Sequence, residues 1–260
     1  MRYTEFNKRV KKHLTNYKNN VLRIKENGLY KGEEKGHILP GKVESNFLSD
    51  TYSLYTKYCN ENRLNTYSNH LNSSQIMCMN FFLPLFNEEE IFNRMISEIL
   101  GVNQEDLGKI VDIFCNAMHN EKYQFDIYIE YSGGYKVFIE TKYSEENFRT
   151  FQGKDKDQAW EERYKDLLNS SLYLKDLEKE VFYKDYQIYR NIGLIKDEKD
   201  YVIFLYPFDN ERIRNKLKEF KLEQVREVDW NSITYDVLKL LKDTDLEEYY
   251  KEFSMKYLNY

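Results

Sequence analysis

Residues 123–146 read YQFDIYIEYSGGYKVFIETKYSEE, and this stretch decides the fold. Two runs of alternating apolar residues flank Ser132-Gly133-Gly134, a pattern that predicts a β-hairpin. If those three residues form the loop, Ile127 lies opposite Ile139, and the residues just beyond this pair also face each other. A slip of one residue would set aliphatic side chains against charged ones, so burial selects this register.

The predicted register places two carboxylates side by side, those of Asp126 and Glu140. Residues opposite each other in an antiparallel pair have Cβ atoms about 5 Å apart. Side chains alternate along a strand, so Lys142 shares the face of Glu140 while Thr141 points the other way. Two like charges this close are destabilising unless a cation joins them, and a hard divalent metal with oxygen ligands would supply it.

Asp126, a hairpin and then Glu140-Thr141-Lys142 resemble the motif of the PD-(D/E)XK nuclease superfamily. The chain departs from the family in having Phe125 where Pro stands before the Asp, a position that varies. The resemblance implies that Asp126 and Glu140 bind Mg²⁺, with Mn²⁺ as an alternative. It also implies that the Thr141 carbonyl is a further ligand and that Lys142 positions or activates water.

The fold that the resemblance implies is α/β, with a restriction-endonuclease-like core. Its central mixed β-sheet would be flanked by helices and preceded by a helical N-terminal extension. We expect one domain over residues 1–260, with the extension at 1–70 and the nuclease core at 71–260. Residues 201–208 form a continuous apolar run, typical of a strand buried on both faces. Strands alternating with helices likewise favour a mixed sheet covered on both sides.

Shorter patterns predict the remaining elements. Residues 109–115 and 225–228 are expected as strands, and the glycines between residues 28 and 41 indicate a loop. Apolar residues at spacings of three and four predict helices. These cover residues 3–26, 43–58, 87–100, 155–179, 181–195, 233–241 and 246–257.

Residues 70–86 predict a helix that is apolar on nearly all sides and therefore buried, with Ser73 or Asn72 as its N-cap. The run also resembles a segment preceding the catalytic hairpin in an uncharacterised bacterial branch of the superfamily. Many members place a Glu or Gln from an early helix beside the metal, so the resemblance assigns Gln75 a catalytic role. The alternative is a buried Gln bonded to backbone. Asn80 is expected to satisfy core polar groups.

The net charge of −5 does not by itself suggest a nucleic-acid binder, but its distribution is uneven. Residues 1–42 carry eleven basic and four acidic residues, a charge of +7, so the remaining chain carries −12. A basic arm beside an acidic body could bring phosphates to a metal site. The candidate phosphate contacts in the arm are Lys8, Arg9, Lys11 and Lys12. The alternative is an ordinary solvated helix face.

Arg190 is a further candidate phosphate contact. It follows Gln187 by three residues, which places both side chains on one face of a helix. The alternative is that Arg190 pairs with an acid at the core edge, such as Asp185 or Glu180.

Other features bound the class of protein. No apolar run approaches the roughly 18 residues that span a bilayer, and the first residues lack the apolar region of a signal peptide. Cys59, Cys78 and Cys115 are scattered without C-x-x-C spacing, which favours a reducing cytoplasm and no structural zinc. The many Tyr, Lys and Asn residues resemble the usage of an AT-rich bacterial genome.

The favoured interpretation is a Mg²⁺-dependent nuclease that hydrolyses phosphodiester bonds in DNA, acting as an endonuclease more readily than as an exonuclease. RNA as substrate and assembly into homo-oligomers stay open. One rival is a nucleic-acid-binding module that keeps the fold without the chemistry. Another is an interaction protein in which Asp126 and Glu140 merely ion-pair with Lys142 and Lys136.

Overall fold

The central hairpin has the predicted register. A computed structural model describes residues 3–59, 64–115, 118–119 and 123–260. In it, β6 (Ile127–Tyr131) pairs antiparallel with β7 (Lys136–Thr141), and Ile127 lies opposite Ile139. The Asp126 amide donates to the Ile139 carbonyl at 3.2 Å, so the pairing extends one residue beyond β6. Asp126 therefore lies at the Ile139–Glu140 end of β7, although the strand pairing itself stops at Ile127 and Ile139.

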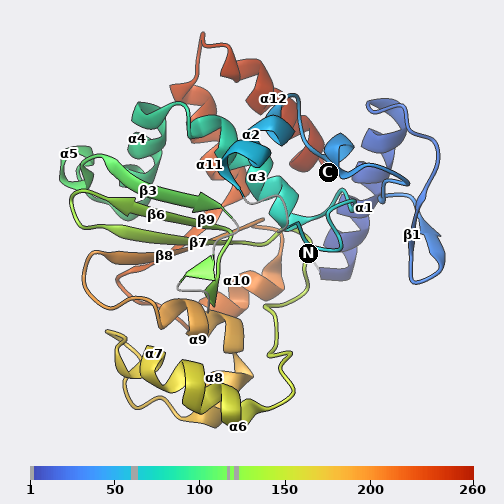
Figure 1. Ribbon diagram of the computed structural model, residues 1–260. Coiled ribbons are helices and arrows are strands. Elements are labelled where there is room, and N and C mark those ends of the chain that lie inside the picture. Colours follow the sequence, from blue (N-terminus) through green and yellow to red (C-terminus); the bar gives the residue numbers. More distant parts are fainter. Residues whose placement is uncertain (1–2, 60–63, 116–117, 120–122) are drawn as a thin grey trace.

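Five strands form the central sheet, in the order β3-β6-β7-β8-β9 (Figure 1). The outer strand β3 (Ile110–Cys115) pairs antiparallel with β6, whereas β8 (Asp200–Tyr206) and β9 (Val225–Asp229) run parallel to β7. Every residue of β8 is buried, as expected for a strand covered on both faces. The three predicted strands outside the hairpin are thus confirmed. Two-residue strands β4 (Met118–His119) and β5 (Tyr123–Gln124) pair beside this sheet.

Helices cover both faces of the sheet (Figure 1). Alternate residues of β7 supply the two cores: Val137 and Ile139 face one, and Phe138 faces the other. The first core also contains α1 (Tyr3–Asn20), α2 (Thr51–Tyr58), α3 (Ser74–Leu85), α4 (Glu89–Leu100), α11 (Trp230–Leu240) and α12 (Leu246–Tyr257). The second contains η3 (Trp160–Tyr164), α7 (Lys165–Asn169), α8 (Lys179–Lys184), α9 (Tyr186–Ile192) and α10 (Glu211–Leu217). Glu140 and Lys142 continue the register of Phe138 and therefore face the second layer.

The buried helix expected over residues 70–86 is α3, and all eleven of its residues after Ser74 are buried. Ser73 is its N-cap, with a side-chain oxygen that accepts from the Ile76 amide at 3.4 Å. Asn80 bonds the Leu48 amide, the Asn46 carbonyl and the Tyr257 hydroxyl. Its expected structural role is thereby confirmed.

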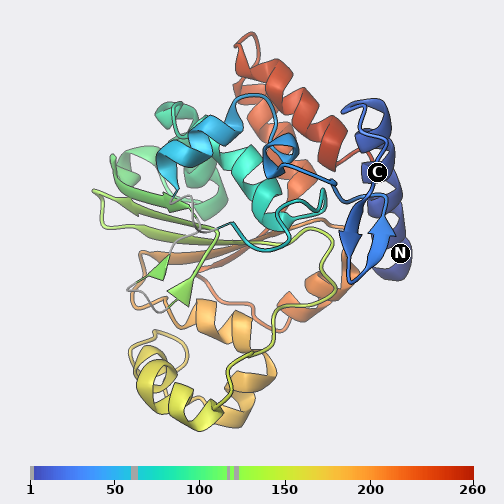
Figure 2. The same ribbon diagram turned by 45° about the vertical axis from the view of Figure 1, so that its right-hand side comes forward.

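The segment predicted as a loop after α1 contains a second hairpin. Strands β1 (Gly28–Tyr30) and β2 (Glu33–Lys35) pair antiparallel, beside α1 in Figure 2. The connecting residues Lys31 and Gly32 have φ values of 52° and 81°, the conformation of a two-residue hairpin turn. Gly32 therefore marks a turn within a hairpin.

Several predicted helices are shorter or broken. The helix expected over residues 3–26 ends at Asn20, and the one over 43–58 divides into η1 (Val43–Asn46) and α2. The segment 155–179 consists of α6 (Lys156–Ala159), η3 and α7, and ends at Asn169. The segment 181–195 divides at Asp185, whose φ of −125° is not helical, into α8 and α9. A short α5 (Gln104–Leu107) precedes β3.

Two of the three cysteines are paired, which the expectation of a reducing environment did not anticipate. Cys59 and Cys115 form a disulfide across 56 residues, with Cα atoms 5.6 Å apart. The sequence carries no signal of this pairing because tertiary packing, not spacing, brings the end of α2 to the end of β3. Cys78 is free and buried in α3.

No helix among the described residues is both long enough and apolar enough to cross a membrane.

Candidate active site

The two carboxylates of the hairpin lie at the ends of neighbouring strands. Asp126 immediately precedes β6, and Glu140 is the penultimate residue of β7. One oxygen of Asp126, Oδ2, accepts hydrogen bonds from both the backbone amide and the hydroxyl of Thr141, each at 2.7 Å. These two bonds fix the carboxylate against the strand that carries Glu140.

Glu140 is only 5% exposed, and positive and amide groups surround its carboxylate. The Lys142 ammonium lies 2.5 Å from Oε1. The Gln187 amide donates to the same oxygen at 2.6 Å, and the Asn191 amide donates to Oε2 at 3.3 Å. The buried charge is therefore paired and hydrogen-bonded, as a buried carboxylate requires.

Helix α9 supplies the groups that reach Glu140 from the second layer. Gln187, Arg190 and Asn191 recur at spacings of three and four, so they share one face of this helix. The Arg190 guanidinium lies 3.6 Å from Glu140 Oε2 and also donates to Asn191 Oδ1 at 2.9 Å. The acid beside Arg190 is thus Glu140. Asp185, one of the partners suggested by sequence, pairs with Lys216 at 2.8 Å.

The two carboxylates differ in their acidity. Burial, and after it the charge of Glu140, raise the pKa of Asp126 to about 6, although Lys142 and the Thr141 bonds act in the opposite direction. Burial alone would raise the pKa of Glu140, but Lys142 and Arg190 outweigh it and hold that pKa below its ordinary value. The ion pairs of the described residues at this site go to Glu140, so Lys142 and the Thr141 bonds offset only part of the effect of burial and repulsion on Asp126.

A cavity of about 800 Å³ opens onto both carboxylates. It is also lined by Gln75, Thr141, Lys142 and Arg190, so these sequence-predicted residues lie together. The side-chain oxygen of the buried Gln75, at the start of α3, accepts from the Asn65 amide at 3.0 Å. Gln75 thus has the backbone bond of the structural alternative while lining the same cavity. Its catalytic role stays a prediction.

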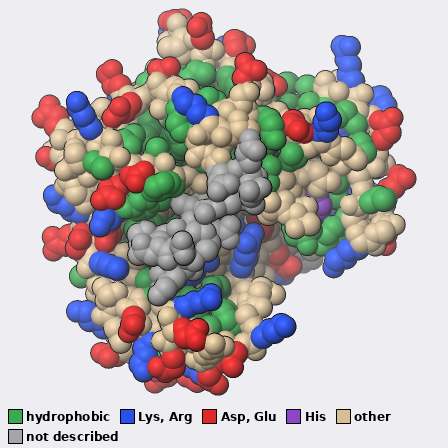
Figure 3. Space-filling view, viewed as in Figure 1, with side chains coloured by type: hydrophobic (Ala, Val, Ile, Leu, Met, Phe, Trp, Pro, Cys, Tyr) green, Lys and Arg blue, Asp and Glu red, His purple; other side chains and the backbone are tan. Residues whose placement is uncertain are grey.

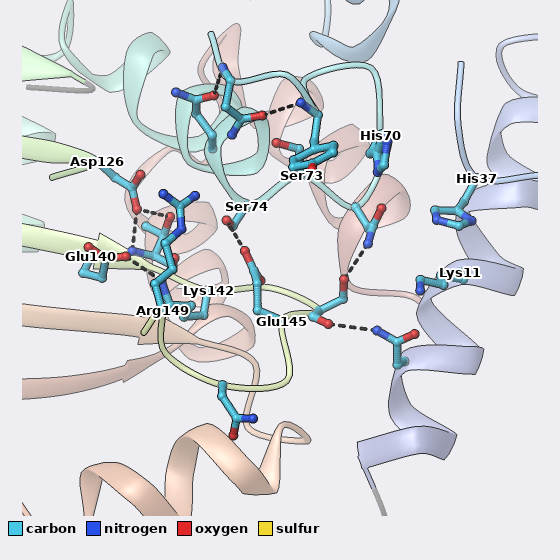
Figure 4. Close-up of a pocket in the computed structure, with 18 of the residues that line it drawn as sticks. Lys11, His37, His70, Ser73, Ser74, Asp126, Glu140, Lys142, Glu145 and Arg149 are labelled. Atoms are coloured by element: carbon cyan, nitrogen blue, oxygen red, sulfur yellow. Dashed lines mark hydrogen bonds and ion pairs between the residues drawn. The ribbon is translucent and has the colours of Figure 1, made fainter. Parts of the chain in front are cut away.

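Sequence reasoning missed Arg149, which lines the cavity beside Lys142, Glu140 and Asp126 (Figure 4). Its side chain is exposed, and its charge contributes to the lowered pKa of Glu140. Its backbone amide donates to Gln187 Oε1 at 2.7 Å, which ties the segment after β7 to α9. No spacing relates Arg149 to the hairpin motif, so only the tertiary structure identifies it.

The four basic residues predicted as phosphate contacts in the N-terminal arm lie in different environments on α1. Lys11 lines the cavity, and Figure 4 shows it across from the carboxylates. Lys8 and Lys12 are exposed, and Arg9 pairs with Asp209 at 2.7 Å. On the face shown in Figure 3, basic and acidic side chains are interspersed. Phosphate contacts by these residues stay a prediction.

The oxygen atoms at this site suit a hard cation that takes few ligands from the protein. The described residues contain no cluster of three or more His, Cys, Asp or Glu side chains that could hold a metal. The hairpin offers two carboxylates and the Thr141 carbonyl, all oxygen donors. Mg²⁺ is commonly held by one or two carboxylates, with waters and substrate phosphates completing the shell. The raised pKa of Asp126 marks the place where added positive charge would relieve repulsion.

Comparison with known proteins places the chain in a family. Neither a curated protein nor a solved structure matches it. One family model, described as restriction endonuclease associating with ARP, matches residues 11–258. That match covers the five-stranded sheet, the hairpin carboxylates, α9 and nearly all of the N-terminal segment. The chain therefore belongs to the family of restriction endonucleases associating with ARP.

Proposed function

We propose that the protein is a divalent-metal-dependent nuclease of the PD-(D/E)XK type that hydrolyses phosphodiester bonds in DNA. The observation that carries the proposal is the geometry at the end of the hairpin, where Thr141 of β7 holds the Asp126 carboxylate beside Glu140 and the Lys142 ammonium. Membership of a restriction endonuclease family supports a nuclease role. The mixed five-stranded sheet flanked by helices is compatible with a restriction-endonuclease-like fold.

Asp126, Glu140 and the Thr141 carbonyl would hold Mg²⁺ or Mn²⁺. When bound, the ion would polarise the scissile phosphate and lower the pKa of the attacking water. The Lys142 ammonium lies against the Glu140 carboxylate, where it can orient that water or stabilise negative charge on the phosphorane. Gln75, which lines the same cavity, would position a ligand or water there.

Arg190 and Arg149 would supply positive charge to a phosphate bound beside the carboxylates. Both line the cavity, and a guanidinium suits bidentate contact with a phosphate. Of the four candidate phosphate contacts in the arm, Lys11 lines the cavity and would contact a phosphate inside it, whereas Lys8, Arg9 and Lys12 would contact phosphates outside it. We infer DNA as the substrate from the family description, with endonucleolytic action.

The proposal is tested by assaying cleavage of plasmid and linear DNA with Mg²⁺, Mn²⁺ or EDTA. We expect metal-dependent cleavage that falls by on the order of 10²–10³-fold in Asp126→Asn and Lys142→Ala. Asp126→Asn keeps the size of the side chain and an oxygen for Thr141, so its fold should survive, and circular dichroism checks this. Glu198→Gln, an exposed acid outside the cavity, is the matched control. Equal cleavage by wild type and Asp126→Asn would overturn the proposal.

Thermal unfolding provides a test that does not depend on finding a substrate. A ligand present at about 100 times its dissociation constant stabilises the native state by about 2.7 kcal/mol. We expect Mg²⁺ or Mn²⁺ to raise the melting temperature of the wild type but not of Asp126→Asn. If the metal leaves both proteins unchanged, the carboxylates are structural partners of Lys142 and Thr141. DNA binding without cleavage under any metal would instead favour the silent binding module.

A further inference from the structure

The cavity extends well beyond the carboxylates. Its opposite wall is built by the N-terminal segment and contains Lys11, Tyr30, Lys35, His37, Tyr67 and His70, which we call the ring wall. Figure 4 shows Lys11 and His37 across the cavity from Asp126 and Glu140. A volume of about 800 Å³ lies within the range of sites for small ligands and cofactors and exceeds the needs of one metal ion and one phosphate.

Aromatic rings dominate this wall. The His70 ring lies 5.4 Å from Tyr30, 5.2 Å from Tyr67 and 6.2 Å from His37, measured between ring centroids. Tyr67 is 50% exposed, so much of its ring is accessible to a ligand. Nucleobases stack on exposed aromatic rings with little dependence on sequence, because every base has a π-face.

The positive charge of the ring wall comes from its lysines. Burial, followed by the charge of Lys11, lowers the pKa of His37 to about 4, and the same two causes lower the pKa of His70. Both imidazoles are therefore neutral rings at neutral pH. Lys11 provides a local positive potential that suits the phosphate attached to a stacked base, and Lys35 adds to it although it also pairs with Glu33 at 2.5 Å.

Backbone hydrogen bonds hold the ring wall in place before any ligand binds. The Leu71 amide donates to the His37 carbonyl at 3.0 Å, and Ile38 forms a β-bridge with His70. The side-chain amide of the buried Asn46 also donates to the backbone carbonyls of Ser68 and His70, each at 2.8 Å. A preformed wall pays little ordering entropy on binding.

The ring wall is also tied to the catalytic strand. Ser144 follows Lys142 by two residues, and its carbonyl accepts from the Asn7 amide of α1 at 2.8 Å. Its hydroxyl accepts from the Asn72 amide at 2.7 Å. Residues before and after the ring wall in sequence, Asn7 and Asn72, therefore both bond the segment that follows Lys142, and these bonds help to fix the distance between the rings and the carboxylates.

We propose that the ring wall is a subsite for one unpaired nucleotide of the substrate strand. The base stacks on Tyr67 and His70, its phosphate lies near Lys11 and Lys35, and the strand continues to the scissile phosphate at Asp126 and Glu140. A base inside a duplex cannot offer its faces to these rings, so the subsite selects single-stranded or locally opened substrate. This inference rests on the proposed nuclease function and specifies the substrate of that same site.

The test uses single-stranded oligonucleotides containing 2-aminopurine, whose fluorescence is quenched by stacking, with the full-length protein in EDTA. We expect quenching with the single strand and much less with the blunt duplex. Tyr67→Ala and His70→Ala should each weaken single-strand binding by about 5- to 100-fold, the effect of losing one stacked base. Tyr235→Ala removes a tyrosine of similar exposure outside the cavity and should bind like the wild type.

Equal affinity of wild type and Tyr67→Ala for the single strand would overturn the subsite, as would equal quenching by single strand and duplex. These experiments distinguish a failure of the subsite proposal from a failure of the proposed nuclease function. Quenching that depends on Tyr67, in a protein that cleaves nothing with any metal, leaves the subsite standing and removes the nuclease. Cleavage that depends on Asp126, without quenching, removes the subsite alone.

Discussion

Each end of the cavity has one buried ionisable group, Glu140 among the carboxylates and Lys256 behind the ring wall. The surrounding residues stabilise these two groups in different ways. At the carboxylate end, cations and amides surround Glu140, and its pKa lies below the ordinary value. Behind the ring wall, Lys256 is 1% exposed and donates to the side-chain and backbone oxygens of Asn46. Burial lowers the pKa of Lys256 to about 7.

The two groups therefore differ in whether their charge is maintained. The surroundings of Glu140 keep it ionised, whereas those of Lys256 allow the neutral form. Glu140 stays ionised because Lys142 and Arg190 offset its burial, and an ionised carboxylate is what a metal ion requires. Lys256 bonds neutral oxygens, so it can lose its proton and still donate a hydrogen bond to Asn46. The side-chain amide of Asn46 in turn donates a hydrogen bond to the His70 carbonyl, so Lys256 and Asn46 together help to position the His70 ring.

Among the substitutions that distinguish the two ends of the cavity, Arg149→Ala should have the largest effect, and it should act at the carboxylate end alone. Removing a positive group that faces developing charge on the phosphate costs on the order of 10²-fold in rate. We expect kcat for metal-dependent cleavage to fall by that factor, while 2-aminopurine quenching at the ring wall persists. Arg94→Ala, an exposed arginine on α4, is the control. An unchanged kcat would show that Arg149 is not part of the reacting end.

Gly28→Ala should act at the ring wall alone. A Cβ at Gly28 would lie 2.4 Å from the Leu39 carbonyl oxygen and equally close to an Ile38 methyl, so the backbone beside His37 must move. Overpacking of this kind costs about 1–3 kcal/mol of unfolding free energy. Denaturant unfolding should show that loss together with weaker oligonucleotide stacking.

Gly41→Ala is the matched control, because an added Cβ there meets nothing within 4 Å. The metal-induced rise in melting temperature should survive in Gly28→Ala. If that rise disappears as well, the two ends of the cavity do not respond independently.

The carboxylate end was predictable because it depends on local order. Period-two alternation and one turn predicted the register of the hairpin, and the structure confirms it from Ile127 opposite Ile139 to Glu130 opposite Lys136, which brings Asp126 to the end of β7 that carries Glu140. The ring wall was not predictable, since Lys11, Tyr30 and His70 come from separate segments that only tertiary packing joins. The turn at residues 31–32 offered a weak signal, but charged residues obscured the β1–β2 alternation.

Lys256 makes the stability of the ring-wall support depend on pH. Its pKa is about 7 in the folded protein and near 10.5 when unfolded, so between these values the unfolded state binds the extra proton. The free energy of unfolding should therefore rise with pH, by about 2 kcal/mol between pH 7 and pH 9. Denaturant titrations at each pH measure it.

Lys256→Met lacks the titrating group, so this rise should be absent in the variant even if its overall stability is lower. The charge of Glu252 and the rings of Tyr17 and Tyr257 also lie near the ammonium and are unchanged by the substitution. An identical pH dependence in both proteins would mean that Lys256 keeps its ordinary pKa.

The smallest expected effect concerns the contact that joins the two ends. Asn72 donates to the Ser144 hydroxyl at 2.7 Å, a neutral side-chain bond whose net contribution is about 0.5–1.5 kcal/mol. A double-mutant cycle with Asn72→Ala and Ser144→Ala isolates this coupling in the free energy of unfolding. Measured on cleavage of single-stranded DNA, the same cycle reports whether the contact aligns a stacked base with the scissile phosphate. We expect coupling of similar size in kcat/KM. Coupling in stability without coupling in cleavage would mean that the rings and the carboxylates share a cavity but not a substrate strand.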